Sequence, residues 1–428
     1  MLSKNRTPQT HSSGGSVAIV AWQSKPAVFP QNATGVGGLE TAAWTFAKGL
    51  AARTSWSPKL VFRSTSPLSK TQVEGVQLHA EVDRWETIRR NVSDCVDVSN
   101  RRLTRFSAKL FWQIPLLGLS WPFRQRDPVL MQPDPRLTSL HPDVWVAMGV
   151  GKETAGVVAT AASQGRPSVV MLRSGADLDE KYARQELSYS DYGERSDVCR
   201  FALENANYIV CQTEFQLSRL RTLFGREGKL IRNPIAIERW KTQSSDSSNV
   251  DVKPKHILWI GRYEQFAKRI QLAMQIIDRC PETQFRMIVN PDDFEVEQQV
   301  RAWLPSNVEL LDYVPFDQMP QQYTQAIGLL VTSSSSAEGF PNVLLQAAAS
   351  GTPIVSLEDF DDFIKKSSAG WVCDGNLDRA AEQLKQIPFE NNSDRHRQTD
   401  QFLVEHHALD RVTDQLANLL TQITSRPN

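Results

Sequence analysis

Short apolar runs recur along the chain and alternate with stretches whose apolar residues have helical spacing. Runs such as 17–22, 143–148 and 168–172 are apolar at successive positions, which is typical of parallel strands buried on both faces. Stretches such as 41–52 and 153–164 repeat apolar residues three and four positions apart, as on one face of a helix. We therefore expect an α/β protein with a doubly wound parallel sheet.

A second series of the same kind follows the polar linker KTQSSDSSNVDVKPK. Two such series in tandem predict two Rossmann-like domains that face each other across a cleft. The expected strands of the second series are 256–260, 284–289, 308–311, 327–332, 353–357 and 370–373. The expected divisions are a disordered tail at 1–16, an N-terminal domain at 17–240, the linker at 241–255, a C-terminal domain at 256–393 and a helical segment at 394–428.

Charge is balanced over the 428 residues but is unevenly distributed. Residues 1–232 contain 30 Lys and Arg against 21 Asp and Glu, and the remainder contains 18 against 27. This asymmetry suggests that the two halves meet different partners. We expect no nucleic-acid partner.

The cysteines and histidines indicate the redox compartment of the protein and whether it binds a metal. The five cysteines are scattered without a CxxC pair, which favours reduced thiols in a cytoplasmic protein. No run approaches the roughly 20 apolar residues of a membrane span. The seven histidines show no metal-ligand spacing, so we expect no metal site. We also expect no cofactor.

Residues 99–126 combine cations with apolar and aromatic side chains and contain no acidic residue. One interpretation is a segment that lies on an anionic membrane surface, which would make the protein peripheral on the inner face of the membrane. The other is a core-packing loop with a solvated basic edge. The cations are Arg101, Arg102, Arg105, Lys109, Arg124 and Arg126.

The stretch 327–358 predicts a strand, a loop, a helix and a second strand. The loop contains Glu338, and the helix begins near Pro341. Free amides at a helix start attract phosphate, whereas a carboxylate repels it and suits neutral hydroxyl groups. Together they favour a nucleotide-sugar, although an ordinary loop with an exposed glutamate is the alternative from this stretch alone.

Arg262 and Lys268 follow the first strand of the second domain. Two cations at the carboxyl end of a strand would neutralise a diphosphate, with arginine bidentate and lysine as a point charge. A solvated basic loop is the alternative. Two other patterns are weaker: the glycine loop 35–40 matches GxGxxG incompletely, and the pair Asp177 and Asp179 would suit a divalent cation.

Taken together, these motifs resemble the retaining GT-B glycosyltransferases of family 4. The resemblance rests on GGLE at 37–40, NPI at 233–235, Gly261-Arg262 with Lys268, and EGFP at 338–341. It implies a donor site for a nucleotide-sugar in the C-terminal domain and a glycan or lipid-linked acceptor on the N-terminal domain. It also implies hexosyl transfer with retention of configuration in polysaccharide or glycoconjugate biosynthesis.

The resemblance further assigns roles to single residues. Arg262 and Lys268 would clamp the diphosphate, and Glu338 would contact the transferred sugar. The remaining donor-binding positions would be Gly37, Gly38, Gly339, Phe340, Pro341, Asn342, Val343 and Gln346.

Two positions depart from the family pattern. Gln346 stands where a glutamate usually binds the ribose, and Arg173 stands where a histidine is frequent. Arg173 is therefore a candidate contact for an anionic donor or acceptor. The competing readings are a hydrolysing sugar-nucleotide epimerase, a metal-dependent GT-A transferase and a noncatalytic nucleotide-sugar-binding protein. The base, the sugar, the acceptor and the oligomeric state do not follow from these residues.

Overall fold

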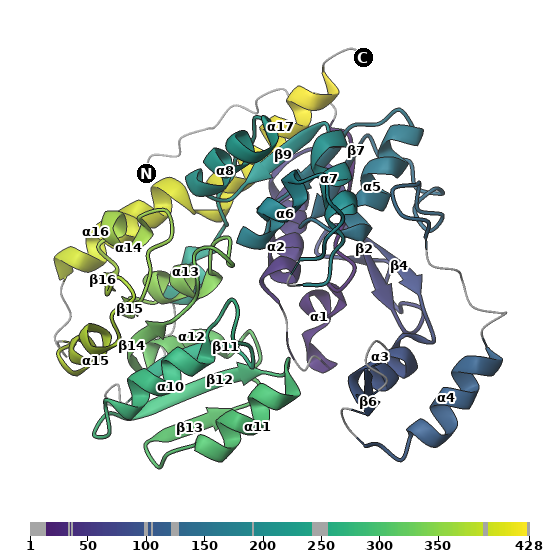
Figure 1. The fold of residues 1–428 in the computed structure, drawn as a ribbon. Helices are drawn as coiled ribbons and strands as arrows, with labels where there is room; N and C mark the ends of the chain where they lie inside the picture. The colour runs from purple at the N-terminus through teal and green to yellow at the C-terminus, as the bar shows by residue number, and fades with distance from the viewer. Residues whose placement is uncertain are drawn as a thin grey trace, which may run out of the picture.

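The computed structural model describes residues 14–32, 35, 37–97, 102–103, 106–120, 128–190, 192–241, 256–387 and 393–425. They form two α/β domains, each built on a mainly parallel sheet, which confirms the predicted fold class. The N-terminal domain, purple to teal, lies beside the green C-terminal domain in Figure 1. The expected tail and linker fall almost wholly outside the described residues.

The N-terminal sheet has the described strand order β10-β9-β8-β7-β1-β2-β4-β3, with β3 antiparallel and the other pairs parallel. Its central strand β7 is buried at every position, as the apolar run predicted. The strands are β1 (Ser16–Val20), β2 (Ser57–Ser64), β3 (Gln72–Val73), β4 (Val76–Val82), β7 (Val144–Met148), β8 (Ser168–Met171), β9 (Tyr208–Cys211) and β10 (Lys229–Leu230).

Helices cover this sheet, and local sequence signals set their ends. Thr213 caps α8 by accepting a hydrogen bond from the Gln216 amide, and Gly225 ends α8 with a left-handed φ of 61°. The helices are α1 (Lys25–Val28), η1 (Pro30–Asn32), α2 (Gly38–Arg53), α3 (Glu86–Cys95), α4 (Leu110–Leu119), α5 (Lys152–Ser163), η3 (Gly175–Leu178), α6 (Glu180–Ala183), α7 (Ser196–Asn205) and α8 (Glu214–Phe224).

The C-terminal sheet is parallel in the order β13-β12-β11-β14-β15-β16. Its strands are β11 (His256–Arg262), β12 (Phe285–Asn290), β13 (Val308–Leu311), β14 (Ala326–Val331), β15 (Ile354–Ser356) and β16 (Gly370–Val372). Its helices are α10 (Ile270–Asp278), α11 (Phe294–Trp303), α12 (Met319–Thr324), α13 (Asn342–Ala349), α14 (Phe363–Ser367) and α15 (Leu377–Lys385). Because β11 and β14 are neighbours, the loops at their carboxyl ends meet at the same edge.

The chain passes between the domains twice. The Ile235 amide donates to the His407 carbonyl at 2.8 Å, and the Leu409 amide donates to the Ile235 carbonyl at 3.0 Å. After the first passage, α9 (Ile237–Lys241) packs on α12 and α13, ahead of the linker where the sequence placed the boundary. Before the second passage, α16 (Ser393–His406) packs on α13 and α14 of the C-terminal domain. After it, α17 (Leu409–Thr424) packs on α2 of the N-terminal domain.

The segment 99–126 is described in part, and its apolar centre forms the helix α4. This helix contacts α3 and lies at the edge of the N-terminal domain in Figure 1. Leu110 and Gln113 face inward, whereas the large apolar side chains of Phe111, Trp112 and Leu119 are exposed. None of the described helices is long and apolar enough to cross a membrane. A further beta pair, β5 (Val96–Asp97) and β6 (Arg102–Leu103), precedes α4. The expected cations that lie outside the described residues are Arg101, Arg105, Arg124 and Arg126.

Candidate active site

A cleft of about 760 Å³ separates the two sheets. The N-terminal domain lines it with the ends of β1, β7 and β8 and the start of α2, and the C-terminal domain lines it with the end of β11 and the loop before α13. Doubly wound folds bind ligands at the carboxyl ends of their strands. The site residues expected from the sequence all line this cleft.

Lys268 and Glu338 meet in the cleft as an ion pair. The lysine Nζ lies 2.5 Å from the glutamate Oε1, and the two side chains are only 16% and 14% exposed. The sequence assigned one residue to phosphate and the other to sugar, without a contact between them. Because the pair is largely shielded from water, its mutual attraction is stronger than that of a surface pair. A phosphate that reaches Lys268 must therefore compete with the Glu338 carboxylate.

The loop that carries Lys268 is held by residues that sequence reasoning did not single out. Glu264 accepts hydrogen bonds from the amides of Ala267 and Lys268. Arg269 has a left-handed φ of 51° and donates to the Thr332 and Ser333 carbonyls at 2.6 and 2.7 Å. The loop after β11 is thereby tied to the end of β14.

Arg262 has a looser setting at the end of β11. It pairs with Asp292 at 3.2 Å, and the two side chains are nearly half exposed. Burial raises the pKa of Asp292, and the Arg262 charge opposes that rise. Since water screens this pair, Arg262 can turn toward an incoming anion at little cost.

The loop before α13 is anchored by its own buried aromatic residue and by the side chain of Asn233. Phe340 packs against Phe363 and His407, with ring centroids 5.3 and 5.4 Å away. Asn233 donates to the Phe340 carbonyl at 3.1 Å and to Asn342 Oδ1 at 2.8 Å. Pro341 stands at the N-cap position, just before the helix. The amides that open α13 therefore face the cleft from a fixed position.

Gln346 is positioned by a buried tyrosine. The hydroxyl of Tyr323, which is fully buried, donates to Gln346 Oε1 at 2.7 Å. The amide oxygen of Gln346 is thus already used once, and its amide nitrogen remains as a donor toward the cleft. Glutamine and glutamate both offer a side-chain oxygen to the Tyr323 hydroxyl, so either residue can make this contact.

The glycine loop before α2 forms the opposite wall. A Cβ at Gly38 would lie 3.4 Å from Asn342 Nδ2 across the cleft, and a Cβ at Gly37 would overlap Glu40 Oε2. The glutamate side chain therefore folds back over the loop and occupies the space beside Gly37. Burial raises the pKa of Glu40, and the charges of Arg262 and Arg173 oppose this rise.

Arg173 follows β8 and lines the same cleft. Its Nε and Nη1 atoms are buried and have no hydrogen-bond partner among the described residues. Burial lowers the pKa of Arg173 to about 10, and the carboxylates of Asp177 and Glu40 act in the other direction. The side chain therefore remains charged at neutral pH.

The acidic pair that suggested a divalent cation has structural roles instead. Asp177 accepts hydrogen bonds from the amides of Val150, Arg173 and Ser174 at 3.1, 2.5 and 2.9 Å. Asp179 accepts from the Lys181 amide at 2.9 Å and caps α6. In the part of the chain that the structure describes, no group of three or more His, Cys, Asp or Glu residues could hold a metal ion.

The two domains touch at the base of the cleft. Ser174 Oγ and the Gly175 amide donate to the Ala337 carbonyl at 2.6 and 2.9 Å. A Cβ at Gly175 would overlap the Ser336 carbonyl oxygen, so only glycine permits this approach. Arg232 and Asp361 form a second contact at 2.6 Å.

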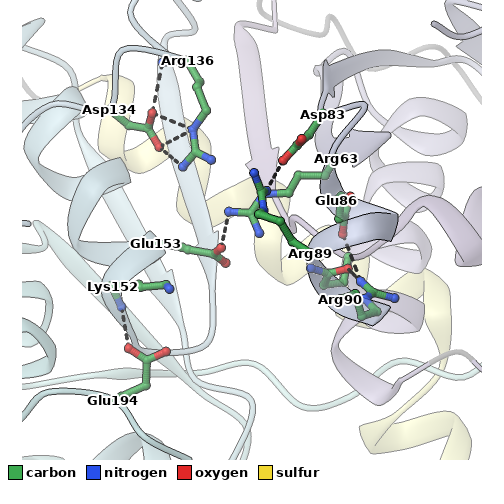
Figure 2. Close-up of polar contacts among 11 residues, drawn as sticks. Arg63, Asp83, Glu86, Arg89, Arg90, Asp134, Arg136, Lys152, Glu153 and Glu194 are labelled. Atoms are coloured by element: carbon green, nitrogen blue, oxygen red, sulfur yellow. Dashed lines mark hydrogen bonds and ion pairs between the residues drawn. The ribbon is translucent and has the colours of Figure 1, made fainter. Parts of the chain in front are cut away.

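On the N-terminal side, Trp22 and Glu153 line the cleft, and a set of paired charges contacts these two side chains (Figure 2). Arg63 Nη2 lies 2.5 Å from Glu153 Oε1, and Arg136 pairs with the buried Asp134. The two guanidinium groups lie 5.1 and 4.4 Å from the Trp22 ring centroid. These arginines do not line the cleft themselves, but they contact the Trp22 and Glu153 side chains that do.

Glu153 and Glu194 bring carboxylates to the N-terminal side of the cleft. Glu194 accepts from the Lys152 amide at 2.9 Å, at the start of α5 (Figure 2). The sequence offered one signal for Glu153, since it follows the loop after a buried strand.

Comparison with known proteins agrees with this geometry. Residues 254–387 match the family described as glycosyl transferases group 1. The chain is similar to sucrose-phosphate synthase from Thermosynechococcus elongatus (TM-score 0.66, 14% identity, 96% of this chain and 99% of that chain covered). It is also similar to a point mutant of S. aureus TarM in complex with Fondaparinux, alpha-GlcNAc-glycerol and UDP (TM-score 0.61, 11% identity, 95% and 99% covered).

A third similar structure is the UDP-forming alpha,alpha-trehalose-phosphate synthase from Burkholderia vietnamiensis (TM-score 0.58, 12% identity, 96% and 100% covered). At these identities the solved structures show a shared fold, that of the GT-B glycosyltransferases. No curated protein sequence matches. The family match and the shared fold support a glycosyltransferase of the GT-B type.

Proposed function

We propose that the protein is a retaining glycosyltransferase that moves a hexosyl group from a nucleotide-sugar to a glycan or lipid-linked acceptor. The observation that carries the proposal is the shielded Lys268–Glu338 pair in the cleft, beside the amides that open α13. Both residues lie within the range that matches glycosyl transferases group 1. A cation for phosphate and a carboxylate for hydroxyl groups suit the two halves of such a donor.

In the proposed donor complex, Lys268 and Arg262 bind the diphosphate together with the first amides of α13. Gln346 contacts the ribose, and Glu338 accepts hydrogen bonds from the sugar hydroxyls. The glycines at 37 and 38 leave room for the donor beside Asn342, as the close approach of Gly38 to that side chain supports.

The proposed reaction needs no protein nucleophile. The acceptor oxygen bonds to the anomeric carbon on the face from which the diphosphate leaves, so the configuration is retained. The departing phosphate oxygen takes the acceptor proton. Lys268 and Arg262 stabilise the charge that develops on the diphosphate, and the walls of the cleft hold the reactants in line. In this proposal, the carboxylates of Glu153 and Glu194, which line the cleft, accept hydrogen bonds from hydroxyl groups of the acceptor.

The test is release of nucleoside diphosphate, measured with an acceptor panel and with EDTA present. We expect release that requires acceptor and survives EDTA, because Arg262 and Lys268 supply the positive charge that a metal supplies elsewhere. Release without acceptor would favour a hydrolysing epimerase, and binding without release would favour a noncatalytic protein. Loss with EDTA and rescue by manganese would contradict the proposed role of the two cations.

We further propose a cytoplasmic protein that attaches to an anionic membrane surface through α4. In this helix Phe111 and Leu119 are each 76% exposed, which is unusual for large apolar side chains. Lys109 precedes the helix, and the sequence on either side is basic. Apolar groups flanked by cations suit an interfacial helix. The five cysteines are free and buried, which supports a reducing compartment.

Replacing Phe111 and Trp112 together with serine is expected to reduce cosedimentation with phosphatidylglycerol vesicles. Burial of one such side chain is worth about 1.5–3 kcal/mol, so we expect at least a tenfold lower partition coefficient. Val404→Ser is the control, because Val404 is exposed on α16. Replacing Arg101, Arg102 and Arg105 with Gln should weaken binding at low salt. An unchanged bound fraction in both variants would contradict the proposal.

A further inference from the structure

Arg173 is a partly exposed cation on the border of the cleft, and its Nε and Nη1 atoms belong to the buried part of the side chain. Its Nε and Nη1 atoms find no hydrogen-bond partner within the described ranges, although the side chain borders the cleft. A guanidinium removed from water without a partner costs free energy, so such groups are normally paired. The position therefore needs an explanation beyond packing.

The nearby carboxylates do not supply the partner. Asp177 is committed to three backbone amides, as described above. Glu40 folds back beside Gly37, where a Cβ would touch its carboxylate. They lower the cost of burying the Arg173 charge through their fields, but neither is a hydrogen-bond partner of its Nε or Nη1 atom. These two nitrogen atoms are therefore unpaired in a side chain that borders the cleft.

The backbone places Arg173 beside the sugar-contacting loop. Ser174 forms a β-bridge with Glu338, and a Cβ at Gly339 would lie 3.0 Å from the Arg173 carbonyl oxygen. Arg262 stands on the other domain at the end of β11, where it pairs with Asp292. An anion that contacts Arg173 is thus expected next to the transferred sugar.

We propose that Arg173 binds a carboxylate on the transferred sugar, so that the donor is a nucleoside diphosphate sugar acid of the hexuronate class. A guanidinium fork and a carboxylate match in shape and charge and form two parallel hydrogen bonds. The inference rests on the proposed function, because it uses the position of the sugar above the 338 loop. It adds the substrate class, which the family match does not specify.

The experiment measures affinity by calorimetry for matched donors that differ in the carboxylate. The pairs are UDP-glucuronate with UDP-glucose and GDP-mannuronate with GDP-mannose, with UDP and GDP alone as references. The proteins are the full-length wild type, Arg173→Gln and Arg173→Lys, each checked for folding by thermal melting. We expect the wild type to prefer the sugar acid of one pair by about ten- to a hundredfold.

Arg173→Gln should abolish this preference while leaving the affinity for the bare diphosphate within about twofold. Arg173→Lys should keep part of it. The inference is overturned if the wild type binds the bare diphosphate but does not prefer the acid, or if the preference survives in Arg173→Gln. Equal weakening of the bare diphosphate would show that the anion is the diphosphate itself. Absence of binding by any nucleotide or donor would instead overturn the proposed function, and the inference with it.

Discussion

Replacing Gly175 with alanine is expected to lower kcat/KM by about a hundredfold or more. The added Cβ would overlap the Ser336 carbonyl oxygen and lie 2.8 Å from its carbonyl carbon. Both atoms are backbone of the opposite domain and have no side-chain rotation to relieve the overlap. The loop that carries Glu338 must therefore move away, and a displacement of about 1 Å is enough for losses of this size.

Gly118→Ala is the matched control, because a Cβ at Gly118 meets nothing within 4 Å. Initial rates of the two variants should differ by the full expected factor, while their melting temperatures stay close to that of the wild type. An unchanged kcat/KM for Gly175→Ala would mean that turnover occurs with the domains farther apart than in this structure.

Lys268→Ala is expected to weaken nucleoside diphosphate binding by about ten- to a hundredfold. A charge-assisted hydrogen bond is worth roughly 1.5–3 kcal/mol, and the variant also leaves Glu338 as an uncompensated carboxylate near the phosphate. The same loss should appear with the sugar nucleotide, because the diphosphate is common to both. Isothermal titration with the two ligands measures it.

Glu338→Ala should behave differently, because the glutamate competes with phosphate for Lys268. We expect its affinity for the bare diphosphate to stay constant or increase, while turnover falls with the loss of the sugar contact. Gln346→Ala should weaken both ligands modestly, since the ribose is common to them. If Glu338→Ala weakens the bare diphosphate as much as Lys268→Ala does, the sugar does not lie over the 338 loop.

The fold was accessible from the sequence because its central strands are buried on both faces. Such strands appear as continuous apolar runs, and the predicted runs 143–148 and 168–172 contain β7 and β8, in which every residue is buried. The ends of α8 are also marked in the sequence, because Thr213 caps its start and Gly225 follows its last residue. Helix α4 was less accessible, because Pro115 and apolar residues on all sides hide its periodicity.

The contacts in the site were not accessible in the same way. Lys268 and Glu338 lie far apart in sequence and meet because β11 and β14 are neighbours in the sheet. The unpaired Nε and Nη1 atoms of Arg173 depend on where Asp177 and Glu40 place their carboxylates, and these are set by backbone hydrogen bonds. Residue type and spacing indicate the chemistry of a site, whereas strand order decides which groups touch.

The return of α17 to the N-terminal domain affects the order in which the two domains can fold during synthesis. Val412, Leu416 and Leu420 belong to the same core cluster as Phe46 of α2, so this core lacks its covering helix until the C-terminal domain has been synthesised. A ribosome adding about 5–20 residues per second completes the C-terminal domain first, during an interval on the order of ten seconds. The domain that emerges first is therefore the last to close, and its apolar face is exposed to chaperones meanwhile.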